Sequence, residues 1–252
     1  MPETARHPDD AVDRLLEKGG HVGRLLASLS PQSQAEFRRL VRLKTVPART
    51  TLVHEGEEPT EIGYVLSGTL AMTKLLPDGR VHIIGLLVPR DLYGRLFDGN
   101  YRYNIEAVSE ARLMSLDRAG FERLLSHEAE AERHLLVQVL EELEASREWI
   151  LLLNGPKGIN RVAAFLVILA RRLDPGAEPE PPLEVELPLS RHDLANYLST
   201  RPETLSRTFH ELADLGIRRR LGPNRFQILS LPALLEASGQ DLTLPERTTR
   251  PG

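Results

Sequence analysis

The chain of 252 residues contains no cysteine. This absence excludes disulfides, thiolate metal sites, cysteine-held iron–sulfur clusters and thiol nucleophiles. No apolar run approaches the ~20 residues that cross a membrane, and the acidic N-terminus lacks the apolar core of a signal peptide. With 41% hydrophobic and 27% charged residues, the composition is that of a globular protein with room for two modest domains. We expect a cytoplasmic protein that does not contact a membrane.

Motifs for catalysis are also missing. The sequence contains no nucleophile–base–orienter set, no phosphate-binding loop and no metal-spaced cluster of His, Asp and Glu. The side chains of the neighbours His192 and Asp193 diverge on a helix and form no dyad. No pair of histidines in the N-terminal half has i, i+4 spacing, and a lone histidine is more often a surface or core residue than a haem ligand. We expect neither an enzyme, nor a metal site, nor a bound haem.

The most informative stretch runs from Leu189 to Phe226. Apolar residues at helical spacing between Leu194 and Leu198 predict a first helix, and the polar break 199–201 has the length that joins the two helices of a helix-turn-helix. Pro202 suits the first position of a second helix, since its missing N–H costs nothing there. A capping box of Thr200 and Glu203 is an alternative start for that helix.

The second helix has two faces. The apolar face, at i, i+4, i+7 spacing, consists of Leu205, Phe209 and Leu212. The polar face consists of Glu203, Ser206, Arg207 and His210. A polar face is usually only solvated, but Arg can form two hydrogen bonds to guanine, Glu accepts from cytosine, and Ser bonds several base edges. These residues lie in the first two turns, the part of a recognition helix that enters the major groove.

The charge distribution agrees with a DNA-binding module. Residues 190–225 hold seven Arg and four acids, an excess of three positive charges, whereas the whole chain carries 32 − 36 = −4. A basic segment on an acidic protein is the expected electrostatic footprint of a part that binds double-stranded DNA.

The remaining chain has distinct segments. After two short helices, β-type runs separated by Gly, Pro and Asp suggest a jelly roll, in which Pro77-Asp78-Gly79-Arg80 is a hairpin turn. These runs are 51–54, 63–66, 69–76, 81–87, 105–108 and 111–116. We expect a flexible arm (1–20), with a turn of helix at 12–16 as the alternative, and then a β-roll (21–125) and a long helix (126–154). A winged helix-turn-helix with its hairpin at 217–229 (155–240) and a disordered tail (241–252) follow.

The long helix carries an apolar stripe at alternating four- and three-residue steps, close to a coiled-coil seam. The stripe consists of Leu136, Leu140, Leu143, Ile150 and Leu153, and is broken only at Arg147. A helix packed on its own domain is the alternative. Pairing between chains is favoured because each helix-turn-helix of a dimer reads one half-site.

Two parts of the sequence resemble a known family. Pro202-Glu203-Thr204-Leu205-Ser206-Arg207 resembles the E-x-x-S-R signature of the FNR branch of the CRP/FNR transcription regulators. Gly56-Glu57, the run from Gly63 to Gly68 and the run from Pro89 to Gly94 resemble the cyclic-nucleotide-binding β-roll of the same superfamily. The resemblance implies an α+β fold with an N-terminal β-roll, a long dimerisation helix and a C-terminal winged helix-turn-helix.

It also implies a function and roles for residues. The chain is expected to be a transcription activator that binds as a homodimer to an FNR/FixK-like TTGAT-N4-ATCAA repeat. Arg207 would read guanine, Glu203 the cytosine and adenine edges of the opposite strand, and Ser206 a thymine. Pro202 belongs to the same base-reading set but replaces the residue that many relatives carry there, so the resemblance does not specify the reading of the outer base pairs. Phosphate contacts would come from Ser190, Arg191, Arg201 and Thr204, and a contact with RNA polymerase from Pro77, Asp78, Gly79 and Arg80.

The effector is not implied by the resemblance. Where cyclic-nucleotide binders have a Gly-Glu pair and an Arg-Ser pair, this chain has Gly94-Arg95 and Arg102-Tyr103. Guanidinium cannot accept from a ribose hydroxyl, and a phenol crowds the phosphate, so we expect no cAMP. An effector-gated regulator that senses haem, nitric oxide or another small molecule in the roll is an alternative. A ligand-binding module or an enzyme without DNA activity would leave the polar helix face unexplained.

Overall fold

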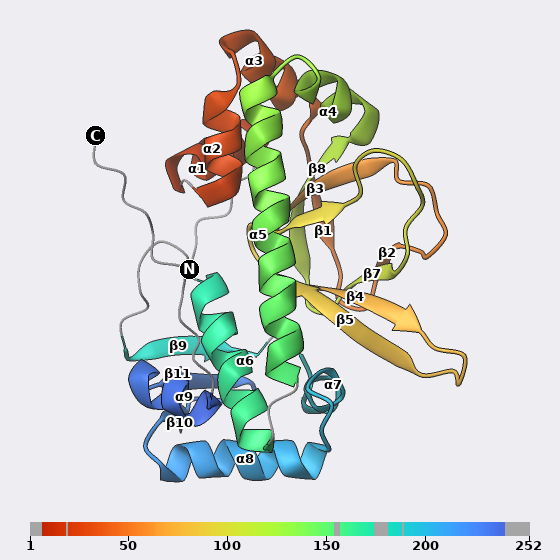
Figure 1. The fold of residues 1–252 in the computed structure, drawn as a ribbon. Coiled ribbons are helices and arrows are strands. Elements are labelled where there is room, and N and C mark those ends of the chain that lie inside the picture. The colour runs from red at the N-terminus through yellow and green to blue at the C-terminus, as the bar shows by residue number, and fades with distance from the viewer. Residues whose placement is uncertain (1–6, 19, 154–156, 174–180, 188, 240–252) are drawn as a thin grey trace. The chain divides into compact units, whose positions relative to one another are not determined.

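The computed structural model describes residues 7–18, 20–153, 157–173, 181–187 and 189–239 (Figure 1). The chain divides into two compact units, residues 1–148 with 187–197 and residues 149–186 with 198–252. Helix α7 (Arg191–Tyr197), which we expected in a continuous domain 155–240, belongs to the first unit, where it contacts strand β5 (Val81–Leu87). No helix in the described ranges is long and apolar enough to cross a membrane.

The first unit is a β-roll with helices on one side. Its helices are α1 (Pro8–Lys18), α2 (Gly20–Ser28), α3 (Pro31–Leu40), α4 (Arg118–Leu125), most of α5 (Ala129–Leu153) and α7. Its strands are β1 (Arg42–Val46), β2 (Thr51–Val53), β3 (Glu61–Ser67), β4 (Leu70–Leu75), β5, β6 (Leu92–Gly94), β7 (Asn104–Ala107) and β8 (Ala111–Asp117). They form two antiparallel sheets with the orders β1-β8-β3-β6 and β2-β7-β4-β5.

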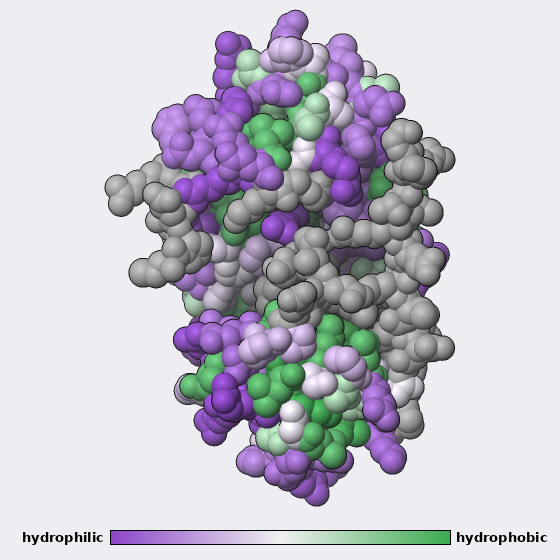
Figure 2. Space-filling model, turned by 90° about the vertical axis from the view of Figure 1, so that its left-hand side faces the viewer, coloured by the Kyte–Doolittle hydropathy of each residue, from purple (hydrophilic) through white to green (hydrophobic). Residues whose placement is uncertain are grey.

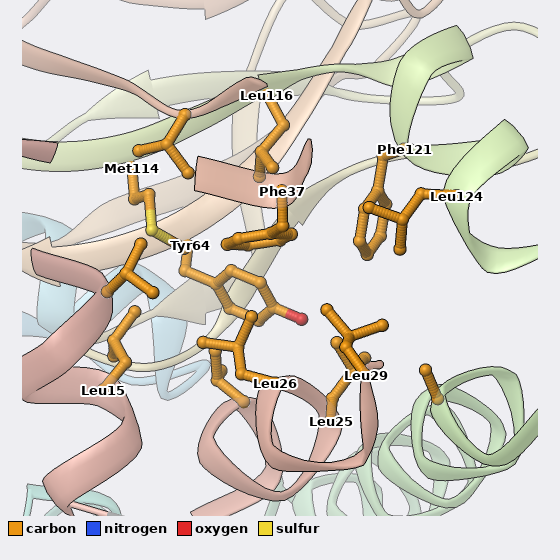
Figure 3. Close-up of a cluster of buried hydrophobic side chains, with 14 of the residues drawn as sticks. Leu15, Leu25, Leu26, Leu29, Phe37, Tyr64, Met114, Leu116, Phe121 and Leu124 are labelled. Atoms are coloured by element: carbon orange, nitrogen blue, oxygen red, sulfur yellow. The ribbon is translucent and has the colours of Figure 1, made fainter. Parts of the chain in front are cut away.

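In the sheet β1-β8-β3-β6, the central strands β3 and β8 are buried on both faces. Along β3, Val65 joins the core between the two sheets, whereas Tyr64 joins a second core beneath the helices. On β8, Leu113 and Met114 divide between the two cores in the same way, since successive side chains of a strand point to opposite faces. The second core also contains residues of α1 to α5 (Figure 3), and the outward surface of the N-terminal helices is largely hydrophilic (Figure 2).

The expected flexible arm is wrong for Pro8–Lys18. These residues form α1, which buries Val12 and Leu15 in the core under the helices. Arg38 of α3 holds the polar side of α1 through its Nη2, 2.5 Å from Oδ1 of Asp13. The apolar stripe is short and surrounded by acids, so the sequence resembled a solvated arm.

The second unit contains the wing and its supporting helices. Its elements are α6 (Gly158–Leu173), β9 (Leu183–Glu186), α8 (Pro202–Asp214), β10 (Arg218–Arg220), β11 (Arg225–Ile228) and α9 (Leu231–Ser238). The strands pair antiparallel in the order β10-β11-β9. Helix α6 contacts both α8 and α9, and its buried residues, such as Phe165 and Leu166, form the core of the unit.

Candidate nucleic-acid interface

The side chain of Ser190 caps the start of helix α7. The hydroxyl of Ser190 accepts from the backbone N–H of Asp193 at 3.1 Å and donates to Oδ2 of the same residue at 2.6 Å. The first of these bonds satisfies one backbone N–H donor at the start of the helix. The hydroxyl of Ser190, which we predicted to contact a phosphate, is therefore already engaged as a helix cap.

The turn before α8 fixes where the second helix starts. Ser199 has a φ of +49°, the left-handed conformation that lets the chain reverse within four residues. Arg201 is the N-cap, with an extended backbone and no side-chain cap bond, and Pro202 occupies the first turn. The alternative capping box of Thr200 and Glu203 is therefore wrong, whereas the predicted start at Pro202 is confirmed.

The two predicted faces of α8 are present. Leu205, Phe209 and Leu212 are at most 2% exposed, and Thr208 is buried beside them. The polar residues Glu203, Ser206, Arg207 and His210 are exposed. Within the described part of the chain, the side chains of Glu203, Ser206 and Arg207 have no hydrogen-bond or ion-pair partner, so they are available to a ligand. His210 instead bonds back through Nδ1 to the carbonyl oxygen of Ser206 at 2.7 Å.

A recess of about 330 Å³ lies between α8 and the start of α6. It is lined by Lys157, Gly158, Ile159, Thr204, Arg207, Thr208 and Glu211. A Cβ on Gly158 would lie 3.2 Å from Cγ2 of Thr204, so the glycine lets the two helices approach closely. The charged residues of the lining are the cations Lys157 and Arg207 and the carboxylate of Glu211. Lys157 was not among the predicted phosphate residues, although a lysine directly before a helix is a signal that can be read from the sequence.

The remaining predicted phosphate residues lie in different settings. Arg201 is exposed, Thr204 lines the recess, and Arg191 is half-buried with interactions of its own. The sequence did not predict that Arg218 in the wing is buried, at 7% exposure. One of the seven arginines counted as a basic surface therefore points inward.

The predicted stripe on α5 is exposed where its side chains are described. The exposed fractions are 58% for Leu136, 50% for Leu140, 46% for Leu143 and 60% for Ile150. Val139, at 51%, extends it. The side chain of Leu153 lies outside the described residues. The opposite side of α5 contributes Ala131 and Leu135 to the core, so the alternative of a helix packed on its own domain holds for that side alone.

The turn Pro77–Arg80 joins β4 and β5 as predicted, with Leu75 paired to Val81. Gly79 supplies a positive φ of 82°, and Arg80 holds Asp78 through an ion pair of 2.6 Å. Hydrogen bonds from Arg80 lower the pKa of Asp78, so its carboxylate stays charged. The turn is exposed together with Leu75 and Val81.

Arg95, Arg102 and Tyr103 of the roll lie in different settings. Arg95 donates through Nε and Nη2 to the carbonyl oxygen of Asp98, at 3.0 and 2.7 Å, and thus folds back onto its own loop. Arg102 is exposed, and burial raises the pKa of the half-buried Tyr103. Across the described ranges, no three His, Asp or Glu side chains are grouped to hold a metal ion.

Comparisons with known proteins agree with this architecture. Residues 160–237 match the Crp-like helix-turn-helix domain, and residues 43–128 match the cyclic nucleotide-binding domain. The nitrogen fixation regulation protein FixK of Bradyrhizobium diazoefficiens is 30% identical over 80% of this chain and 88% of its own. The transcriptional activator protein FnrL of Cereibacter sphaeroides is 29% identical over 85% and 88%. The structure of FixK2 from Bradyrhizobium japonicum has a TM-score of 0.70 at 26% identity and covers 78% of this chain and 96% of that one.

A β-roll, a long helix and a winged helix-turn-helix with an exposed polar recognition face define a DNA-binding transcription regulator. The chain belongs to the CRP/FNR family, in its FNR/FixK branch. The expected fold class is thereby confirmed, and the relatives are regulators rather than enzymes.

Proposed function

We propose that the chain acts in the cytoplasm as a homodimer, which places two copies of α8 in successive major grooves, ~34 Å apart, of a TTGAT-N4-ATCAA repeat. The observation that carries this proposal is the free polar face of Glu203, Ser206 and Arg207, opposite a fully buried apolar face. A helix of this kind would offer its base-reading groups without first breaking bonds within the protein.

The side chains divide the base-reading task by their chemistry. Arg207 donates two hydrogen bonds to the N7 and O6 atoms of guanine, and Glu203 accepts from the N4 atom of cytosine and the neighbouring adenine on the opposite strand. Ser206 contacts a thymine. Pro202 is half-buried at the start of α8 and carries no hydrogen-bond donor. The outer base pairs would therefore be recognised through the shape of the DNA rather than through hydrogen bonds to base edges.

Contacts to phosphate fix the register of the helix. Arg201, Arg191, Ser190 and Thr204 take this role, and we add Lys157 because it lines the recess that Arg207 and Thr204 share. A phosphate in this recess would lie beside the guanine contact. Backbone and base recognition would then be coupled at one end of α8.

The exposed stripe on α5 supports the proposed dimer. Side chains such as Leu136, Leu140 and Leu143 are about half exposed at coiled-coil spacing, which is the pattern of a surface that a second helix covers. Leu143→Asp should yield a monomer that no longer binds the repeat, and Leu143→Met, which keeps an apolar side chain, should remain a dimer. A dimer of the Asp variant in light scattering would refute the assignment.

Selection of bound duplexes from a random pool tests the reading of bases. The wild-type protein should enrich the TTGAT repeat. Arg207→Ala should lose ~1–3 kcal/mol of binding free energy and relax the choice at one base pair, whereas Arg191→Ala should weaken all sequences alike. If both variants return the wild-type motif with unchanged affinity, these roles are wrong.

Activation would use the turn Pro77–Arg80 as a contact with RNA polymerase. Its support is the exposed position of Asp78 and Arg80 at the tip of a two-stranded hairpin. The double variant Asp78→Ala/Arg80→Ala should lower expression from a reporter while operator binding is unchanged. Full reporter activity in that variant would dispose of this contact.

We further propose that the roll works without cAMP, haem or an iron–sulfur cluster. The retracted Arg95 and the bulky Tyr103 support this for cAMP, because neither offers the acceptor or the small hydroxyl that the nucleotide needs. A Soret band in protein from haem-supplied cells, or heat of binding on titration with cAMP, would contradict the proposal.

A further inference from the structure

One charged side chain of the wing lies inside the second unit. Arg218, the first residue of β10, is 7% exposed. Its Nε–H donates to the carbonyl oxygen of Phe209 in the middle of α8, at 2.8 Å. Its guanidinium carbon lies 4.9 Å from the ring centre of Phe209 and 6.0 Å from that of Phe226 on β11. Arg218 thus touches the recognition helix and the neighbouring wing strand at once.

Stability alone is a poor reason for a charge in this position. Removing a guanidinium from water is costly, and an apolar residue of similar volume often serves equally well or better in a protein core. The two phenyl rings, 6.0 Å apart at 60°, already pack on each other without the arginine. What an apolar residue cannot supply is the directional bond to the backbone of α8.

From this geometry we propose that Arg218 is a positioning residue, which fixes the rotation of α8 about its axis relative to the wing. Phe209 lies between Arg207 and His210, so a bond to its carbonyl group acts at the level of the recognition face. The tip of a helical side chain lies ~5–6 Å from the axis, and a rotation of about 10° moves it ~1 Å. Binding sites tolerate only about 0.5 Å of displacement. Losing this bond should therefore lower the preference of α8 for its own sequence over others.

The proposal rests on the proposed function of α8 and concerns a different measurement, the preference for one sequence over others. A matched pair of variants separates the bond from the packing. Arg218→Gln places an N–H donor at the position of Nε, whereas Arg218→Met has the same chain length and places a methyl group there. Both variants lack the rest of the guanidinium, so they lose the same ring contacts.

The probe is the duplex that the full-length wild-type protein itself selects from a random pool, compared with a scrambled duplex of equal composition. Affinities for both are measured by fluorescence anisotropy, and folding by thermal melting. Arg218→Met should lower the ratio of the two affinities by about fivefold or more, the lower end of what one bidentate base contact supplies. Arg218→Gln should keep the ratio within about twofold of wild type, since its amide donates from the same place.

Different outcomes would overturn the role of Arg218 and the proposed function of α8. Equal ratios for the Gln and Met variants would overturn the proposal, as would loss of folding in both, because Arg218 would then serve packing or stability alone. A wild-type protein that enriches no sequence would overturn the proposed function itself. A wild-type protein that selects a repeat other than TTGAT corrects only the operator, and the comparison of the variants stands.

Discussion

Replacing Tyr64 with phenylalanine should make the protein more stable. Tyr64 is fully buried, and its hydroxyl points among apolar side chains of the core beneath the helices, near Leu29 (Figure 3). Among the described residues, this oxygen has no hydrogen-bond partner. Burial raises the pKa of Tyr64 well above its usual value, so the phenol is neutral at physiological pH.

The size of the effect follows from the unpaired hydroxyl. A buried polar group without a partner costs ~1–3 kcal/mol, and phenylalanine removes that group without changing the shape of the ring. We expect a gain of about 1 kcal/mol in the free energy of unfolding, which corresponds to ~2–4 °C in melting temperature for a protein of this size.

Tyr101 supplies the matched control. Its hydroxyl donates to the carbonyl oxygen of Glu61 at 3.3 Å, and burial raises its pKa to about 12. Tyr101→Phe should therefore lose ~0.5–1.5 kcal/mol. Urea unfolding followed by far-ultraviolet circular dichroism measures both variants. If Tyr64→Phe destabilises the protein as much as Tyr101→Phe does, its hydroxyl is bonded in solution and the reasoning fails.

Other substitutions test local features of the fold. Gly63→Ala should lower the free energy of unfolding measured in urea by ~1–3 kcal/mol or more, because the new Cβ would lie 1.9 Å from the carbonyl oxygen of Met114 on the paired strand. Ser199→Gly should raise the melting temperature by relieving the positive φ, with a gain of at most ~1 kcal/mol; a lower melting temperature would show that the turn is not strained. The hydrogen bond from Ser30 lowers the pKa of Glu128, so its stabilising contribution is complete above the ordinary carboxyl pKa and disappears as the pH falls through the lowered value. Ser30→Ala should flatten this acid-side decline in melting temperature, and an unchanged pH profile would contradict it.

Much of the fold followed from local patterns. The strand β5 has the bounds that its β-type run predicts, and the turn Pro77–Arg80 lies between the strands that it was expected to join. The faces of α8 and its start at Pro202 could be predicted because proline chemistry and helical spacing act within a few residues.

Features that depend on distant residues were missed. Strand β1 has mainly exposed, partly charged residues and becomes a strand through its pairing with β8. The recess needs Lys157 and Thr204 brought together by two helices, and the burial of Arg218 needs the rings of Phe209 and Phe226. These contacts join residues that are far apart in the sequence, so local patterns cannot predict them. The sequence therefore predicted a basic wing in which all arginines are exposed, whereas Arg218 is buried.

One side of helix α5 is buried in the core of its own unit, and the other side exposes apolar side chains. Under the proposed pairing, a single subunit is folded yet incompetent, and the population of paired subunits at low abundance grows with the square of the subunit concentration. A modest rise in synthesis then produces a steep rise in promoter occupancy. Such a protein can respond to its own rate of production, with no small molecule needed to set the threshold.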